Sequence, residues 1–282
     1  MNATQGHYFV PSVSRYSTLL SSGVFFLALG FILRLNGTPA GLWGMLFGAA
    51  LILYVTVGWF GEVIRESVGG IYTKWEDRSY RLGMIWFITS EVAFFACFFG
   101  VLYYLRLISV PELAGFDPAY TLHPDYTSTW PTSGPMGEVF TPMAAWGIPA
   151  INTLLLLTSG ATLTWAHWAL LKNNRTQLIA GLALTILLGA TFMGFQVYEY
   201  MHAYAELGLT LGAGVYGATF YILTGFHGFH VTLGTIMLIV ILGRCMKGHF
   251  DSHNHFGFEA VAWYWHFVDV VWLLLFVFVY WL

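Results

Sequence analysis

Charge is scarce in this chain. Only 9% of its 282 residues are charged and 57% are hydrophobic, whereas about 25% of a soluble domain is charged. A soluble fold of this length would need far more polar surface to cover its core, so the composition excludes that class. The sequence predicts a polytopic helical membrane protein.

Cysteine is scarce as well. Cys97 and Cys245 lie in different apolar segments, which excludes a disulfide framework or a cysteine-based metal site. A net charge of −3 gives no indication of the basic surface that nucleic-acid binding requires. The sequence contains no Gly-rich phosphate loop, nucleophile elbow or catalytic triad signature. The polar amino terminus does not have the design of a cleaved signal peptide, so we expect the first apolar run to stay as an anchor.

Seven segments are long and apolar enough to cross a bilayer, which takes about 20 residues as helix. We place these spans at Ser17–Leu35, Leu42–Phe60, Leu82–Ile108, Trp146–Leu171, Leu178–Met201, Tyr216–Gly243 and Glu259–Trp281. The loop Ser109–Ala145 between the third and fourth spans is rich in proline, which opposes regular helix. Gly44 and Gly48 form a GxxxG pair in the second span, which predicts a close helix contact.

Basic residues fall mainly on one side of these spans. Cytoplasmic loops carry the excess of Lys and Arg in membrane proteins. The pattern therefore places the amino terminus inside and the carboxyl terminus outside. The inner side holds nine of them, Arg15, Arg65, Lys74, Arg78, Arg81, Lys172, Arg175, Arg244 and Lys247, and the outer side only Arg34 and Arg106.

The closing span carries three ionisable residues, Glu259, His266 and Asp269. At 100° per residue they fall within about 80° of one another on a helix. Ionisable groups at membrane depth cost roughly 2.5–3.5 kcal/mol each, so they should face protein, water or headgroups. We expect this face to dock on something polar.

Glu91 is the sharpest candidate for function. It lies nine residues past the start of the third span, about 13 Å into the membrane. No cation lies nearby in the sequence, so desolvation should favour the protonated form. One hypothesis is a proton-linked, gating or lipid-contacting carboxyl, because intramembrane carboxyls are typically functional; the other is a hydrogen bond between helices.

The histidines suggest ligands but do not complete a site. His227 and His230 are three residues apart, a spacing at which two imidazoles could bind haem or metal, but a site needs further ligands. Hydrogen bonding across a tight helix contact is the favoured interpretation. Glu199 and His202 have the spacing of di-iron bundles, but only one copy of that motif is present. His167 and His266 are isolated, and His253 and His255 fall in an inner loop, which disfavours a haem held between two spans.

A basic cluster lies at the inner end of the sixth span. Arg244, Lys247 and His249 gather there, and Arg65 ends the second span. Basic pockets at this depth suit anionic lipid headgroups. Ordinary positive-inside topology would give the same charges, so both interpretations stand.

Five sequence blocks resemble subunit III of the haem-copper cytochrome c oxidases. They touch five of the seven spans or their edges and keep the order of that family. The blocks are VIRES (Val63–Ser67), RLGMIWFITSEVAFF (Arg81–Phe95), NTLLLLTSGATLTWAHW (Asn152–Trp168), YGATFYILTGFHGFHV (Tyr216–Val231) and HFGFEAVAWYWHFVDVVWL (His255–Leu273).

The resemblance implies an all-α fold of seven transmembrane helices in two bundles, helices one and two against helices three to seven, with a V-shaped, lipid-filled cleft between them. We expect an inner amino-terminal segment at 1–16, a two-helix bundle at 17–60, an inner amphipathic connector at 61–81 and a five-helix bundle at 82–282 that includes the outer loop 109–145. No catalytic, haem or metal site is expected in this chain, since haem and copper belong to partner subunits.

The resemblance also assigns residues. Glu91 matches the family's carbodiimide-reactive carboxyl. His227, His230, Glu259, His266 and Asp269 are expected to be interhelix or docking groups. The expected phospholipid-binding residues are Trp59, Arg65, Glu66, Arg244, Lys247 and His249.

The implied role is that of a non-redox core subunit of an aa3-type oxidase, which reduces oxygen to water and pumps protons. Such a subunit sustains proton uptake, holds lipids and contributes to oxygen access. The expected partners are oxidase subunit I as main contact, subunit II, phospholipids and cytochrome c as electron donor, with no nucleic acid. We expect the bacterial inner membrane, or the mitochondrial inner membrane for an organellar chain.

Three alternatives remain. The equivalent subunit of a quinol oxidase is the nearest, but that relative usually lacks the first two helices. A stand-alone proton-coupled transporter using Glu91 would show paired halves and broken helices at the midplane, and neither is evident. A haem-binding membrane enzyme is opposed by the unpaired histidines.

Overall fold

Helices make up the regular structure of the part of the chain that is described. The computed structural model describes residues 13–115, 123 and 125–282. The remaining parts of the expected amino-terminal segment and outer loop lie outside the described residues. Within the described ranges, seven helices are long and apolar enough to cross a membrane. The predicted all-α class and the seven spans are confirmed.

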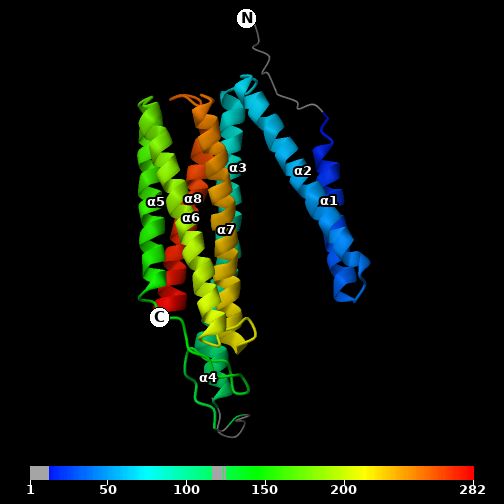
Figure 1. Cartoon of the computed structure of the whole chain (residues 1–282), viewed down its shortest axis with the longest axis vertical. Coiled ribbons are helices and arrows are strands. Elements are labelled where there is room, and N and C mark those ends of the chain that lie inside the picture. Colours follow the sequence, from blue (N-terminus) through cyan, green and yellow to red (C-terminus); the bar gives the residue numbers. More distant parts are fainter. Residues whose placement is uncertain (1–12, 116–122, 124) are drawn as a thin grey trace, which may run out of the picture. The chain divides into compact units, whose positions relative to one another are not determined.

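Most successive helices are joined by short connections (Figure 1). Two spans include a π-helical stretch: α3, η1 and α4 form one continuous helix, and η3 extends α8. The bounds are α1 Tyr16–Leu35, α2 Ala40–Val68, α3 Lys74–Tyr104, η1 Leu105–Ser109, α4 Val110–Leu113, α5 Ile148–Leu171, α6 Arg175–Ala205, α7 Gly214–Met246, α8 Phe256–Leu275 and η3 Phe276–Trp281.

Most of the expected inner connector at 61–81 is helical. α2 continues to Val68 and α3 already begins at Lys74. The 29 residues of α2 span about 43 Å at 1.5 Å per residue, which exceeds the roughly 30 Å hydrocarbon core. Hydropathy reports the length inside hydrocarbon, whereas a helix continues into the headgroup region as long as its backbone bonds are satisfied.

The chain divides into two compact units, residues up to Tyr80 and residues from Arg81 onward. Each is described by itself. The predicted separate packing of the first two helices is confirmed, because α1 and α2 pack on each other while α5 to α8 form their own contacts. The lipid-filled cleft expected between the bundles stays a prediction.

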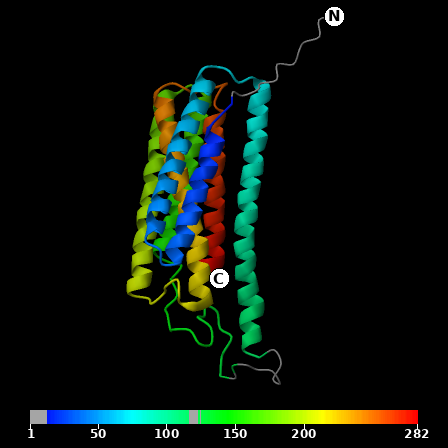
Figure 2. The same ribbon diagram turned by 90° about the vertical axis from the view of Figure 1, so that its right-hand side faces the viewer.

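Glycine holds the first unit together. α1 and α2 lie side by side in antiparallel directions (Figure 2). A Cβ on Gly48 would meet the backbone of Leu27 and Gly23, and one on Gly30 would meet the backbone of Met45. The two backbones therefore approach as closely as the GxxxG pattern predicted.

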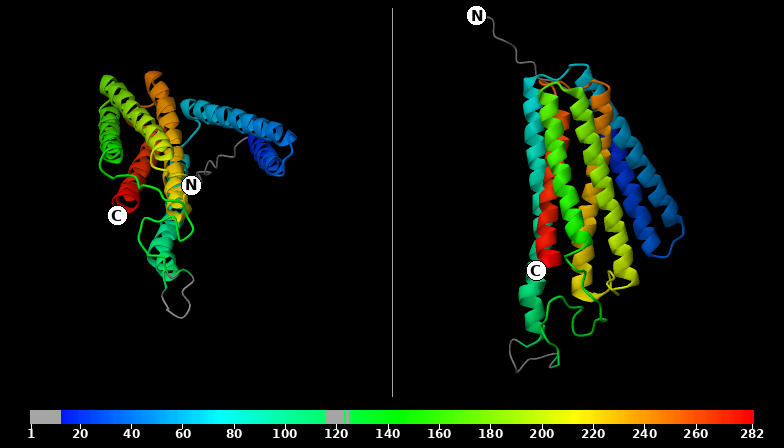
Figure 3. Two further views of the ribbon diagram at one scale, coloured as in Figure 1. Left: turned by 60° about the horizontal axis from the view of Figure 1, so that its bottom comes forward. Right: turned by 60° about the vertical axis from the view of Figure 1, so that its left-hand side comes forward.

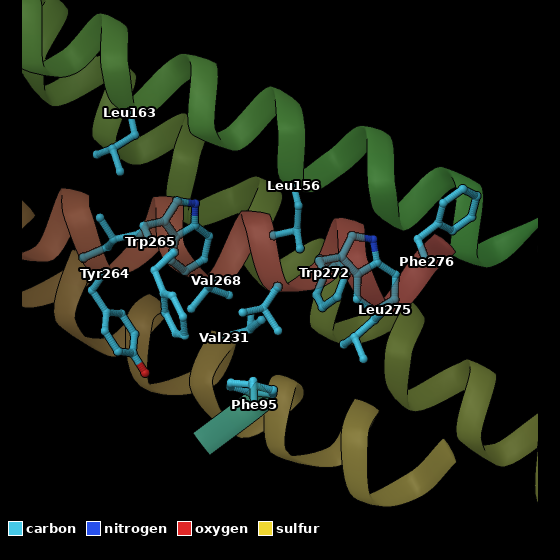
Figure 4. Close-up of a cluster of buried hydrophobic side chains, with 14 of the residues drawn as sticks. Phe95, Leu156, Leu163, Val231, Tyr264, Trp265, Val268, Trp272, Leu275 and Phe276 are labelled. Atoms are coloured by element: carbon cyan, nitrogen blue, oxygen red, sulfur yellow. The ribbon is translucent and has the colours of Figure 1, made fainter. Parts of the chain in front are cut away.

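In the second unit, α5 to α8 form a bundle in which consecutive helices pack on each other and α8 closes on α5 (Figure 3). α8 is the most buried span, with half of its most apolar stretch inside the protein. Its Trp265 and Trp272 point into the core formed with α5, α6 and α7 (Figure 4). Phe95 brings α3 into the same core.

Candidate functional site

Glu91 on α3 faces His230 on α7. His230 Nε2 lies 3.0 Å from Glu91 Oε2, and the two side chains are 9% and 21% exposed. The sequence offered no cation close to Glu91, but the fold supplies a histidine from 139 residues further along the chain. The carboxyl therefore has a specific partner.

The hydrogen bonds of His230 fix the proton count of this pair. Its Nδ1 lies 2.6 Å from the Phe226 carbonyl oxygen, which only accepts, so Nδ1 carries a proton and donates it. A neutral ring then presents a bare nitrogen at Nε2 to Glu91. One further proton must lie between them, either on the glutamic acid or on the imidazolium. In both states the pair has no net charge, which lowers its cost at membrane depth.

Aromatic rings surround this pair. The Phe95 ring centroid lies 5.1 Å from that of His230, and Tyr264 stacks on the imidazole at 6.3 Å. Phe94 packs edge-on against Phe226, the residue that accepts from His230. These apolar rings lower the local dielectric constant, which strengthens the hydrogen bond within the pair.

His227 points to a different helix from His230. Its Nε2 lies 3.2 Å from the Val268 carbonyl oxygen on α8, and its ring packs on Trp272. The two histidines therefore link α7 to α8 and to α3 instead of converging on one ligand. Among the described residues, neither belongs to a cluster of three metal-binding side chains.

The polar face of α8 lies against α5. Glu259 approaches His167, His266 Nε2 lies 3.4 Å from Thr164 Oγ1, and Asp269 Oδ2 occupies the space where Gly160 would carry a Cβ. His266 also pairs with Asp269 at 3.6 Å. The three residues thus contact a neighbouring helix of the same chain.

Glu259 lies in a cluster of charged and imidazole groups. Its Oε2 forms an ion pair with Arg81, and its Oε1 lies 3.3 Å from His255 Nε2 and 3.9 Å from His167 Nε2. Sequence reasoning missed Arg81, His167 and His255 as partners. The four-residue spacing of His255 and Glu259 at a helix start was the available signal.

Arg244 carries unused donors at the basic end of α7. Its Nε and one terminal nitrogen are buried and have no hydrogen-bond partner among the described residues, and the same holds for His249 Nδ1. The Arg244 guanidinium packs over the Phe250 ring at 4.2 Å. Lys247 follows the end of α7 and is exposed. This end of the second unit is suited to an anionic group.

The lipid-binding candidates of the first unit lie near the end of α2. Trp59 and Arg65 are exposed. Glu66 instead accepts a hydrogen bond of 2.5 Å from the Tyr72 hydroxyl. Burial, together with this hydrogen bond, raises the pKa of Tyr72. The bond also engages Glu66 within its own unit.

Glu199 is a buried carboxyl that sequence reasoning considered only for a di-iron motif. The Tyr280 hydroxyl donates to its Oε1 at 2.6 Å, and Gln196 Nε2 donates to the same atom at 3.4 Å. Its Oε2 has no partner in the described part of the chain. This network joins α6 to the end of α8 and η3.

Comparisons with known proteins point to one family over nearly the whole chain. Residues 6–282 match the family model of cytochrome c oxidase subunit III. Cytochrome c oxidase subunit 3 of Branchiostoma lanceolatum is 41% identical over 261 residues, which is 92% of this chain and 90% of that relative. The subunit 3 of Cyprinus carpio is 45% identical over 238 residues, 84% and 83% of the two chains. That of Pongo pygmaeus is 42% identical over 276 residues, 98% and 96%.

Proposed function

This chain belongs to the cytochrome c oxidase subunit III family, and we propose that it sustains proton uptake and turnover in an aa3-type oxidase. It is a multi-pass, non-redox core subunit of the oxidase complex. The haem and copper centres are assigned to its partner subunits, with subunit I as main contact and subunit II beside it. Cytochrome c is proposed as the electron donor to the complex.

The proposed location is the inner membrane of a bacterium, or of a mitochondrion for an organellar chain. The amino terminus would lie inside and the carboxyl terminus outside. The distribution of Lys and Arg over the loops supports this orientation.

The Glu91–His230 pair is the observation that carries the proposed role. The pair holds one proton between its two acceptors, at 3.0 Å, and remains neutral whichever residue carries it. A proton can therefore be held, or moved from one of the two residues to the other, at membrane depth without creating an isolated charge. We propose that this pair acts as a proton reservoir for the neighbouring catalytic subunit.

Replacing Glu91 by Gln tests this role. The amide keeps the shape of the side chain but cannot exchange a proton with His230. We expect the purified complex to retain its haem content and initial rate, and its oxygen consumption to decline several-fold faster during sustained turnover. The control is Glu138→Gln, which removes an exposed carboxyl of the outer loop. Equal decline in both variants would refute the reservoir, and loss of haem in Glu91→Gln would show a structural role instead.

Phospholipid binding is the second part of the proposal. The buried, unpartnered donors of Arg244 need an anionic acceptor, because an unsatisfied buried donor costs about 1–3 kcal/mol and more when charged. The unpartnered Nδ1 of His249 can donate to the same anion when it carries a proton. A lipid phosphate supplies acceptor oxygens at this depth. Lys247 is proposed as a further contact at this end of the second unit. In the first unit, described by itself, Arg65 and Trp59 are proposed as lipid contacts, and Glu66 as a residue that orders the end of α2 through Tyr72.

Arg244→Gln is expected to lower the amount of phospholipid that copurifies with the complex by about one molecule. Phosphorus analysis and mass spectrometry of the extracted lipid give the measurement. Arg34→Gln removes an exposed arginine from the other end of the spans and should leave the lipid content unchanged. An unchanged content in Arg244→Gln would contradict the proposed contact.

A further inference from the structure

Three potential ligand atoms converge where α8 begins. His167 Nε2, His255 Nε2 and a carboxylate oxygen of Glu259 all lie within 4.8 Å of one another. His167 comes from α5, while His255 and Glu259 are four residues apart at the start of α8. The two imidazole centroids are 5.8 Å apart. No other group of three such side chains occurs among the described residues.

We propose that His167, His255 and Glu259 bind a divalent transition-metal ion, with Zn²⁺ as the best match. Two imidazoles and one carboxylate, completed by a water, are an established ligand set for four-coordinate zinc. Glu259 supplies one negative charge and both histidines bind as neutral rings. Nothing in the oxidase role assigned to this family requires the site, so the proposal stands independently of the proposed function.

The hydrogen bonds around the cluster orient its ligand atoms. His255 Nδ1 lies 3.0 Å from the Asp251 carbonyl oxygen, so that nitrogen donates to the carbonyl, and Nε2, which faces Glu259, is the nitrogen that would bind the metal. Metal-bound histidines typically donate their second nitrogen to a carbonyl or carboxylate in this way. His167 Nε2 is buried and has no hydrogen-bond partner among the described residues.

Arg81 does not occupy the oxygen that the metal would use. Its guanidinium pairs with Oε2 of Glu259, whereas both imidazoles face Oε1. The arginine thereby fixes the rotation of the carboxylate. Its positive charge also weakens cation binding, so we expect an affinity below that of a structural zinc site.

The two distances to the carboxylate oxygen need only a small adjustment. Tetrahedral bonds of about 2.1 Å place two ligand atoms about 3.4 Å apart. His255 Nε2 and Glu259 Oε1 are already 3.3 Å apart, and His167 Nε2 is 3.9 Å from the same oxygen. The His167 side chain is 26% exposed, so an ion would reach the cluster from the side of this ring.

Zinc titration of the full chain in detergent tests the proposal. After chelator treatment, bound zinc is counted by elemental analysis at a fixed free concentration for four proteins: wild type, His167→Gln, His255→Gln and His253→Gln. The last is the matched control, because His253 is exposed in the same loop and outside the cluster. Wild type and His253→Gln should each bind one more zinc ion per chain than His167→Gln and His255→Gln.

Cobalt provides a second measurement that does not depend on the total count. Co²⁺ in a tetrahedral nitrogen–oxygen site absorbs visible light much more strongly than hydrated Co²⁺. We expect this absorption in wild type and in His253→Gln, and its loss in His167→Gln, whose partly exposed side chain makes that variant the safer one to fold. Equal zinc stoichiometry in all four proteins, or an unchanged cobalt spectrum in His167→Gln, would overturn the site.

Discussion

Trp265 shows how single residues fix the core of the second unit. Its side chain is fully buried, and its Nε1 donates a 2.9 Å hydrogen bond to Ser159 Oγ. A Cβ on Gly189 or Gly234 would come within 2.7 or 2.8 Å of its ring. Two glycines and one hydroxyl, from α6, α7 and α5, thus make the space and supply the acceptor for one indole.

Ser159→Ala leaves the indole N–H of Trp265 buried without an acceptor. We expect the free energy of unfolding to fall by about 1–2 kcal/mol, measured from the denaturation midpoint of the purified chain in detergent. Thr158→Ala is the control, because Thr158 is the preceding residue of α5 and is exposed. An equal loss in both variants would show that the hydrogen bond contributes nothing.

The sequence alone predicts Glu91 as a candidate residue but does not predict its partner. An intramembrane carboxyl is visible from hydropathy alone, so Glu91 was predicted as a candidate. His230 was also singled out, but for its spacing to His227. Their pairing depends on the packing of α3 against α7. The two residues are 139 positions apart, and the hydrophobic periodicity of a single sequence does not predict contacts at that separation.

At the scale of helices, the contact between α1 and α2 depends on backbone approach. The Cβ of an alanine at position 48 would collide with backbone atoms of Leu27 and Gly23, which cannot rotate away. We expect Gly48→Ala to lower the free energy of unfolding by about 1–3 kcal/mol, as overpacking does.

Gly61 provides the matched test in the same helix. Nothing lies within 4 Å of the position that its Cβ would take, so Gly61→Ala should stabilise α2 by up to about 1 kcal/mol through helix propensity. The two variants should therefore shift the denaturation midpoint in opposite directions. Shifts of the same sign would contradict the close contact.

Helix number was predictable, but helix ends and pairings were only partly so. Apolar runs identified all seven spans, since lipid demands about 20 apolar residues for each. The extension of α2 to Val68 was missed because polar residues continue a helix beyond hydrocarbon without changing its backbone geometry. The GxxxG pair predicted a close contact but not that α1 would make it.

For the molecule as a whole, the buried core belongs to the second unit. Every residue of the main hydrophobic cluster among the described residues, with its partly buried neighbours, is numbered 84 or higher. The first unit buries one large hydrophobic side chain, Val55, and four glycines in its two helices.

A chain that begins at Arg81 should therefore retain its tertiary structure in detergent. We expect its near-ultraviolet circular dichroism, dominated by buried residues such as Trp265 and Trp272, to match that of the corresponding part of the full chain. A chain ending at His255 gives the baseline, because it lacks α8 and with it both Trp265 and Trp272. Loss of the signal in the first variant would show that the core needs residues 1–80.

The glycine contact of α1 and α2 also sets an order of events during biogenesis. Large side chains such as Trp43, Phe47 and Tyr54 are exposed on the outside of the pair. Association of the two helices therefore buries little apolar surface. Hydrophobic collapse therefore cannot assemble this pair in an aqueous compartment. Each helix must first be inserted by the translocation machinery, and recognition between the two follows within lipid.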